Sequence, residues 1–95
     1  MTATSTSTVR IPGVLSVYCG GATRFTVSAP TVRAALERLE GEQPALHRNI
    51  CDETGAVRRH INIFVNSDNV RDRDGIDTRL APGDVVTILP AVSGG

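Results

Sequence analysis

The chain has 95 residues, with ten arginines and ten acidic residues, and therefore no formal net charge. This length suits one domain with a single core of moderate size. The absence of a basic excess, together with only one Tyr and two Phe, argues against nucleic-acid binding. The apolar runs are too short to cross a membrane, and the first residues lack the features of a signal peptide. We expect a cytoplasmic protein that binds neither membranes nor nucleic acids.

The opening segments predict short strands. Residues 1–6 are rich in Ser and Thr without an apolar period, and we expect them to be disordered. The stretch "TVRIP" predicts a first strand that is stopped by Pro12. Residues 14–19 either extend that strand or form a strap. Residues 23–29 alternate clearly, and the turn-like "CGGA" before them predicts a hairpin.

One helix is predicted in the middle of the chain. Thr31 is a suitable N-cap for residues 32–41, and Gly41 is expected to stop the helix. Its apolar residues at helical spacing are Val32, Ala35, Leu36 and Leu39. Residues 44–50 are expected to add one short helical turn.

The second half predicts strands again. Residues 60–66 alternate, which places Asn62 and Phe64 on the face opposite to three apolar residues. Turns are expected around residues 66–69, 72–75 and 81–84, with a brief edge strand at Val70 and Arg71. Residues 84–89 predict the last strand.

The order of these elements predicts an α+β fold, with a mixed sheet of four to five strands and one main helix on one face. The expected inward residues are Phe25, Val27, Leu36, Leu39, Ile61, Ile63, Val65, Val86 and Ile88. The outward residues Phe64, Thr87 and Leu89 are then left on an open face that leads into the C-terminal tail. Such an apolar patch suggests a docking surface, although isolated exposed apolar residues are the simpler alternative.

The cysteines and histidines do not predict a metal site. Cys19 and Cys51 form no C-x-x-C pair, and we expect both to be buried or idle. His47 and His60 have no third ligand at metal spacing, so we expect them on loops or on the surface. We therefore expect no metal, no cofactor and no catalytic residue.

Four stretches resemble one known family: "IPGVLSVYCGG", "TVRAALERLE", "VRRHINIFVN" and "PGDVVTILPAVSGG". They are similar to the ubiquitin-like sulfur carriers of the ThiS/MoaD family, which have a β-grasp fold, and the likeness covers roughly residues 9–95. The last two stretches look most like the actinobacterial CysO-type carriers of cysteine biosynthesis. The resemblance implies a domain over residues 7–90 and a flexible tail over residues 91–95.

The resemblance also implies a function. In the family, the terminal carboxylate, here that of Gly95, is adenylated and then converted to a thiocarboxylate. Gly94 and Gly95 would let the thin tail enter an enzyme channel that a Cβ would obstruct. The docking residues would be Phe64, Leu89, Pro90, Ala91 and Val92. The protein would be a co-substrate and not an enzyme.

The implied partners are an ATP-dependent adenylyltransferase or sulfurtransferase, a PLP-dependent cysteine synthase and a zinc-dependent peptidase, and the free carrier is expected to be monomeric. Delivery of sulfur to molybdopterin, thiamin or a secondary metabolite would use the same chemistry. Two other functions stay open, namely a ubiquitin-like protein modifier and an interaction module with an inert tail. All basic residues are Arg, which reflects either a GC-rich genome or the advantage of lacking ε-amines that could attack an activated terminus.

Overall fold

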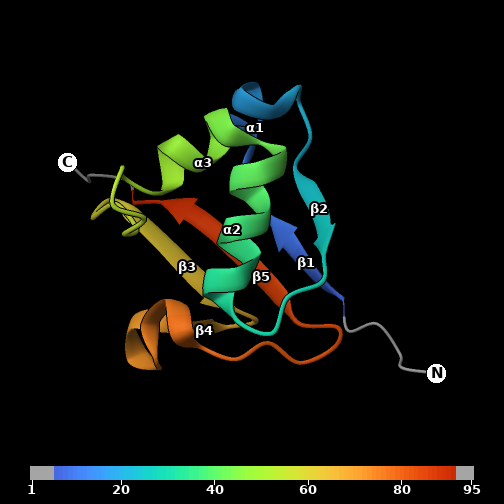
Figure 1. Ribbon diagram of the computed structural model, residues 1–95, viewed down its shortest axis with the longest axis vertical. Helices are drawn as coiled ribbons and strands as arrows, with labels where there is room; N and C mark the ends of the chain where they lie inside the picture. Colours follow the sequence, from blue (N-terminus) through green and yellow to red (C-terminus); the bar gives the residue numbers. More distant parts are fainter. Residues whose placement is uncertain (1–5, 92–95) are drawn as a thin grey trace.

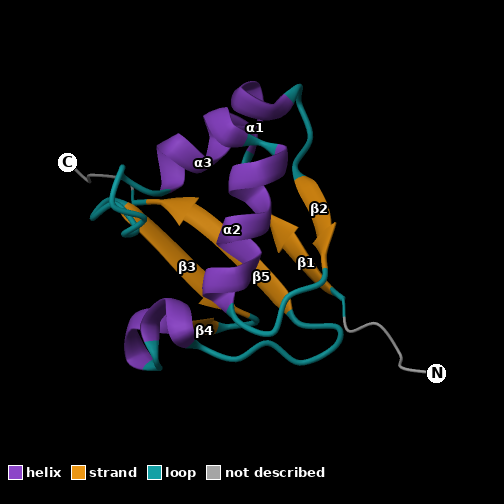
Figure 2. Ribbon diagram, in the orientation of Figure 1, coloured by secondary structure: helices purple, strands orange, loops and turns teal. Residues whose placement is uncertain are grey.

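The computed structural model describes residues 6–91, which form a five-stranded sheet covered on one face by helices (Figures 1 and 2). The strands are β1 (Ser7–Arg10), β2 (Arg24–Val27), β3 (Ile61–Val65), β4 (Asp68–Asn69) and β5 (Val85–Pro90). The helices are α1 (Gly13–Ser16), α2 (Val32–Glu42) and α3 (Pro44–Ile50). The strand order is β2-β1-β5-β3-β4. Strands β1 and β5 are parallel and the other neighbouring pairs are antiparallel, so the predicted mixed sheet is confirmed.

Helix α2 begins where the sequence predicts. The Thr31 hydroxyl oxygen accepts a hydrogen bond from the Ala34 N–H at 3.2 Å, which confirms the predicted N-cap. The predicted stop at Gly41 is wrong, because the helix continues to Glu42. It ends at Gln43, whose backbone is pushed out of the helical region (φ −137°, ψ 69°) because a proline follows.

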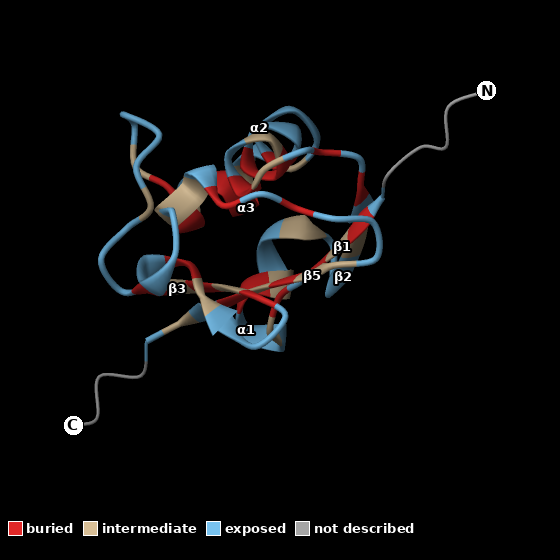
Figure 3. Cartoon of the chain, turned by 90° about the horizontal axis from the view of Figure 1, so that it is seen from below, coloured by how far each residue is buried: buried red, intermediate tan, exposed pale blue. Residues whose placement is uncertain are grey.

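Helix α3 is longer than the single turn expected, since its seven residues make almost two turns. Pro44 begins it, at a position where the missing N–H costs nothing. Leu46 and Ile50 lie on one side of α3 and are fully buried. Helix α2 is the main helix expected, and the shorter α3 packs beside it on the same face of the sheet (Figure 3).

The connection between β1 and β2 is neither of the two forms expected. It folds into α1 followed by a 3-10 turn at Val17–Cys19. Leu15 and Cys19, four residues apart, both pack against the core, which favours a helical path over an extended one. The antiparallel pairing of β1 with β2 is confirmed. Gly20 (φ 71°) and Gly21 (φ 92°) then turn the chain in the left-handed region that glycine tolerates.

The short edge strand also lies elsewhere. It is β4 at Asp68–Asn69, and not Val70–Arg71 as expected. Val70 begins a 3-10 turn (Val70–Asp72), because its side chain is buried in the core and the Asn69 carboxamide oxygen accepts the Arg71 N–H at 2.9 Å.

The core lies between the sheet and the helices α2 and α3 (Figure 3). Eight of the nine predicted inward residues are buried, and the ninth, Phe25, is half-buried. Phe25 is less covered because β2 is an edge strand of the sheet. The alternation of the strands therefore predicted the inner face well.

Candidate functional site

The base of the C-terminal tail lies at the end of β5, a central strand. Pro90 is paired with Ile61 of β3, and the Ala91 N–H donates a hydrogen bond to the His60 carbonyl. Ala91 is the last residue that the structure describes. The predicted site residues Val92, Gly94 and Gly95 lie outside the described residues, whereas Pro90 and Ala91 mark where the tail begins.

Arg71 secures the strand to which the tail base is bonded. Its guanidinium donates to the Asn62 carboxamide oxygen at 2.7 Å and to the carbonyls of Arg59 and Ile61 at 3.2 Å and 3.1 Å. These three bonds hold the start of β3, and His60 lies within the segment that they span. The sequence predicted no role for Arg71 beyond the expected edge strand, and its bonding partners come from a distant loop and strand.

Two predicted docking residues lie on the face of the sheet that α2 and α3 leave open. Phe64 is paired with Thr87 and is half-buried, while Leu89 is paired with Asn62 and is 39% exposed. The predicted outward orientation of Phe64, Thr87 and Leu89 is thus confirmed by the burial of the residues that alternate with them. We call this surface of the sheet the open face.

A second exposed apolar group was missed in the sequence. Val14, Val17 and Tyr18 are 65%, 72% and 42% exposed. Their spacing of three and four residues places them on one side of the helical segment formed by α1 and the 3-10 turn after it, away from the buried Leu15. Because β1 and β5 are parallel, this segment follows β1 at the same end of the sheet as the tail base (Figure 1). The spacing could have revealed the patch, had the segment been taken as helical.

The two cysteines are free thiols in different surroundings. Cys51 is buried, and burial raises the pKa of its thiol to about 11, with a smaller contribution from the Asp52 and Glu40 carboxylates. Cys19 is half-buried, and its thiol donates to the Ala22 carbonyl at 3.2 Å. A thiol with a raised pKa is a poor nucleophile, so Cys51 is unsuited to sulfur chemistry.

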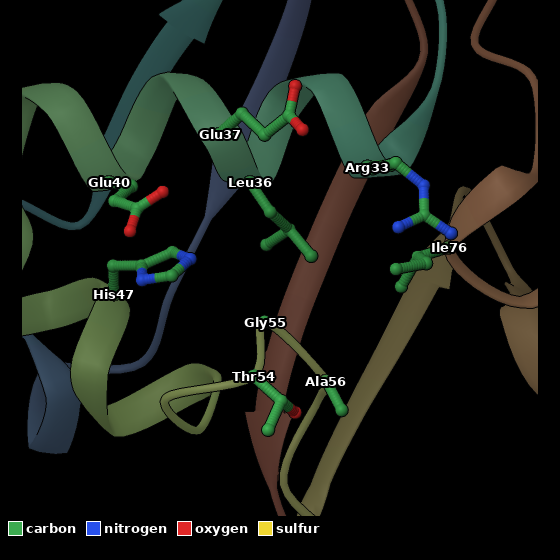
Figure 4. A pocket seen from close by; sticks show the side chains of 9 residues that line it. All are labelled: Arg33, Leu36, Glu37, Glu40, His47, Thr54, Gly55, Ala56 and Ile76. Carbon is green, nitrogen blue, oxygen red and sulfur yellow. The ribbon is translucent and has the colours of Figure 1, made fainter.

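A pocket of about 390 Å³ with a mixed polar and apolar lining lies on the helical side of the molecule, on the other side of the sheet from the open face (Figure 4). Glu40 of α2 and His47 of α3 point toward one another across it, and Thr54 belongs to its opposite wall. His47 is only 8% exposed, so the expectation that it lies on a loop or at the surface is wrong, whereas His60 is exposed as expected. The Thr54 hydroxyl donates to the Asp52 carboxylate at 2.6 Å and not to His47 or Glu40, so the pocket shows no activated nucleophile.

Within residues 6–91, no cluster of three or more His, Cys, Asp or Glu side chains could hold a metal ion. Over the same residues, none of the helices has both the length and the apolar character that a membrane span requires. What the described part of the chain offers is an open, partly apolar sheet face beside the origin of the tail.

Curated relatives match most of the chain. It is 39% identical over 90 residues to "Sulfur carrier protein CysO" of Mycobacterium tuberculosis, an alignment that covers 93% of this chain and 97% of the relative. It is 37% identical over 65 residues to "Small archaeal modifier protein 3" of Haloferax volcanii, which covers 68% of this chain and 70% of the relative.

Solved structures agree. The crystal structure of M. tuberculosis CysO matches with a TM-score of 0.82 and 38% identity, over 90% of this chain and 99% of that one. A chain in the crystal structure of the Amycolatopsis orientalis BexX/CysO complex matches with a TM-score of 0.84 and 32% identity, over 94% of this chain and 99% of that one. These matches confirm the expected β-grasp fold. Residues 14–95 match the profile of the ThiS family. The chain belongs to the ThiS family.

Proposed function

We propose that this protein is a sulfur carrier for cysteine biosynthesis, and that the carboxylate of Gly95 carries the sulfur. The observation that carries the proposal is the 39% identity to a CysO sulfur carrier over 93% of the chain, within a ThiS family match that runs through residue 95. The protein serves as the substrate of partner enzymes, and we place it in the cytoplasm.

The chemistry needs only the terminal carboxylate. A carboxylate oxygen of Gly95 attacks the α-phosphorus of ATP and displaces pyrophosphate, which leaves an acyl-adenylate. A sulfide-level donor then attacks the acyl carbon, the acyl–oxygen bond breaks, and AMP leaves. The product is a thiocarboxylate. An α-carboxyl group has an ordinary pKa of about 3.5, so the nucleophilic oxygen is already ionised at pH 7.

The carrier's own task is to present this group. From Ala91 to Gly95 an extended chain reaches about 17 Å, enough to enter a partner's active site while the sheet stays outside. The Ala91 N–H bond to His60 and the rigid φ of Pro90 give the tail a defined starting point. The chain has no lysine, so no ε-amine of the carrier itself can capture the activated acyl group.

The open face supports a docking role for Phe64 and Leu89. Exposed apolar side chains often mark protein interfaces, and these lie beside the tail that the enzyme must bind. One enzyme surface could therefore contact both the open face and the tail. The adenylyltransferase and the sulfur-accepting PLP-dependent synthase are the partners we propose, with a zinc-dependent peptidase to release the product. A solved CysO chain in complex with BexX supports partner binding by carriers of this type.

The deciding experiment is mass spectrometry of the protein purified from its native cells. Replacement of one oxygen by sulfur changes the mass almost as much as oxidation does, so the C-terminal peptide must be isolated. Cleavage after Arg79 releases residues 80–95, which contain neither Met nor Cys and no further basic residue. A sulfur-for-oxygen exchange in that peptide is the expected result, and a thiol-alkylating reagent should add its alkyl group to the exchanged sulfur and raise the mass of the peptide further.

The matched control is the chain that lacks Gly94 and Gly95, incubated with ATP, a sulfur source and native extract. We expect it to form neither the adenylate nor the thiocarboxylate. Normal pathway activity with the truncated chain would contradict the proposal and favour an interaction module with an inert tail.

A protein-modifier function is the second candidate, because the chain also resembles a protein named as a small archaeal modifier. Activation would be the same, but the Gly95 acyl group would pass to a lysine of a target protein. Tryptic digestion of such a conjugate leaves the whole segment 80–95 on the target lysine. Detection of that branched peptide in native extract would establish modification. Since the chain has no lysine, it cannot form lysine-linked chains with itself.

A further inference from the structure

Two arginines face each other across the edge of the open face. Arg10 of β1 is the direct cross-strand partner of Arg24 of β2, and both side chains are exposed. They alternate with the inward-facing Val9 and Phe25, so both point to the open face. Side chains in such directly opposed positions begin only about 5 Å apart at Cβ, where like charges destabilise the pairing.

Within residues 6–91, none of the outward positions on the strands beside the two arginines carries an acidic side chain that could offset their charges. The other outward positions of β1, β2, β3 and β5 carry Thr, Val, Leu, Phe or Asn. Of the three ion pairs within residues 6–91, none includes Arg10 or Arg24. The first acidic residue of the chain is Glu37, on helix α2, which covers the opposite face. A protein without net charge thus keeps two unneutralised arginines together on one surface.

The pair lies beside the surface that a partner must cover. Arg10 is level with Thr87 of β5, and Thr87 is level with Phe64 of β3. The row across the open face therefore runs from two arginines to an apolar side chain. Leu89 follows on β5, two residues further toward the tail. An enzyme that engages the tail and the apolar strip also meets the arginine pair.

We propose that Arg10 and Arg24 form a positively charged recognition site for an acidic patch on the adenylyltransferase that activates Gly95. This inference rests on the proposed function and adds a charge requirement for that partner. Carboxylates of the enzyme would relieve the repulsion between the two arginines, so the pair becomes favourable only in the complex. Such rim charges chiefly accelerate association and are sensitive to salt.

The alternative is that the charges merely protect an edge strand. Arg24 lies on β2, an edge strand, and charged side chains there discourage pairing with a second sheet. In that role the two arginines would keep the protein from aggregating through β2. Their replacement would then leave binding to the adenylyltransferase unchanged. The test must therefore measure association and not activity alone.

The test uses the full-length chain and the adenylyltransferase purified from native cells by its carrier-dependent ATP–pyrophosphate exchange. The double variant Arg10→Glu/Arg24→Glu is compared with Arg10→Lys/Arg24→Lys, which keeps the charge. The matched control is Arg79→Glu, an exposed arginine that forms a β-bridge with Thr31, the N-cap of α2. An Arg10→Thr/Arg24→Thr variant covers the case in which the glutamates impair folding.

We expect the Glu variant to lower kcat/KM for the carrier about tenfold or more at low salt, with kcat at saturating carrier unchanged. The deficit should shrink as salt is added, the Lys variant should retain most of the wild-type kcat/KM, and Arg79→Glu should resemble the wild type. The Thr variant should lose association while its melting temperature stays equal or rises, because like-charge repulsion is removed.

Wild-type kcat/KM in the Glu and Thr variants, or equal losses in these and Arg79→Glu, would overturn the inference. The chain without Gly94 and Gly95 is assayed in parallel. If that chain is inactive while the arginine variants are normal, the carrier function stands and only the charge requirement falls. If that chain is still activated, the proposed function itself fails.

Discussion

Local surroundings decide what individual polar side chains of this protein can do. Cys51 at the end of α3 and Asp52 beside it are neighbours in sequence, yet their pKa values move in opposite directions. The thiol is buried, which disfavours its charged form. The Asp52 carboxylate instead accepts hydrogen bonds that stabilise its charged form: the Thr54 hydroxyl at 2.6 Å, the Thr54 N–H at 2.8 Å and the Ala56 N–H at 3.2 Å.

The two cysteines should differ in reactivity. In the folded protein at pH 8, iodoacetamide should label Cys19 readily and leave Cys51 largely unlabelled, because Cys51 is buried and its pKa is raised to about 11. Peptide mapping after a timed reaction measures the ratio. In concentrated guanidinium chloride both thiols should react alike, and equal labelling of the folded protein would contradict the burial of Cys51.

Asp52 should make stability depend on acid pH. Its folded-state pKa is lowered, first by the Thr54 hydroxyl and then by the Thr54 N–H, so its contribution is present above the ordinary pKa of 3.8 and is lost as the pH falls through the lowered value. Asp52→Asn should therefore lower the melting temperature at pH 7, and its difference from wild type should narrow below pH 3.8. Glu53→Gln, at the neighbouring exposed position, is the control. A difference that does not change with pH would count against this role of the carboxylate.

At the scale of elements, the ends of helix α2 are set by its N-cap residue and by the proline that follows it, more than by the helix propensity of single residues. Helix α2 starts at its predicted cap but passes through Gly41, since one glycine weakens a helix by only about 1 kcal/mol and the following proline is a stronger constraint. The segment after β1 turned helical because two of its side chains gain burial four residues apart. The end of α2 and the helical form of residues 13–19 therefore depend on residues outside the short sequence pattern from which each element was predicted.

The N-cap of α2 can be tested directly. Thr31→Ala removes the hydroxyl that accepts the Ala34 N–H, and we expect a loss of about 1 kcal/mol in the free energy of unfolding. Urea denaturation followed by circular dichroism measures it. Thr23→Ala, at an exposed loop position, is the control and should change little. An unchanged midpoint for Thr31→Ala would show that the cap adds no stability.

At the scale of the whole molecule, the two-layer architecture gives each strand of the sheet two different environments. In β5, Ile88 is fully buried beneath the helices, while the next residue, Leu89, is 39% exposed on the open face. The same strand thus serves the core with one set of side chains and the surface with the other.

Substitutions at these two neighbours should separate stability from recognition. Ile88→Ala should cost about 2–5 kcal/mol of unfolding free energy, a large part of the stability of a small domain. Leu89→Asp should leave the circular dichroism spectrum largely intact but weaken carrier-dependent ATP–pyrophosphate exchange. Unfolding of Leu89→Asp would mean that the assignment of Leu89 to the open face is wrong.

Much of this arrangement could be predicted before the structure. Alternation in β3 and β5 identified the inner face, because a residue period of two leaves only one face for the core. The cap at Thr31 located the helix. By contrast, the position of β4 and the helical form of residues 13–19 were missed, because short elements are decided by burial against distant parts of the chain.

The candidate site divides in the same way. Phe64, Leu89, Pro90 and Ala91 were found from strand alternation and from the family resemblance, although their docking role stays a prediction. The exposed patch of Val14, Val17 and Tyr18, the bonds of Arg71 and the pairing of Arg10 with Arg24 were not found. The patch was missed because residues 13–19 were not expected to be helical. The other two join residues from different strands or loops, and the register between two strands cannot be read from either strand alone.

The amino-acid pattern was sufficient for the fold class and the inner face of the sheet, because these depend on side-chain periodicity. It also points to the terminal glycines, whose role stays a prediction. The strand order was decided only in the folded molecule. It places β5 between β1 and β3, so the tail starts beside the open face and two arginines meet across a strand pair. These contacts join residues that are far apart in the sequence. They form only when all the strands and the helices α2 and α3 pack together, so no single segment of the sequence determines them.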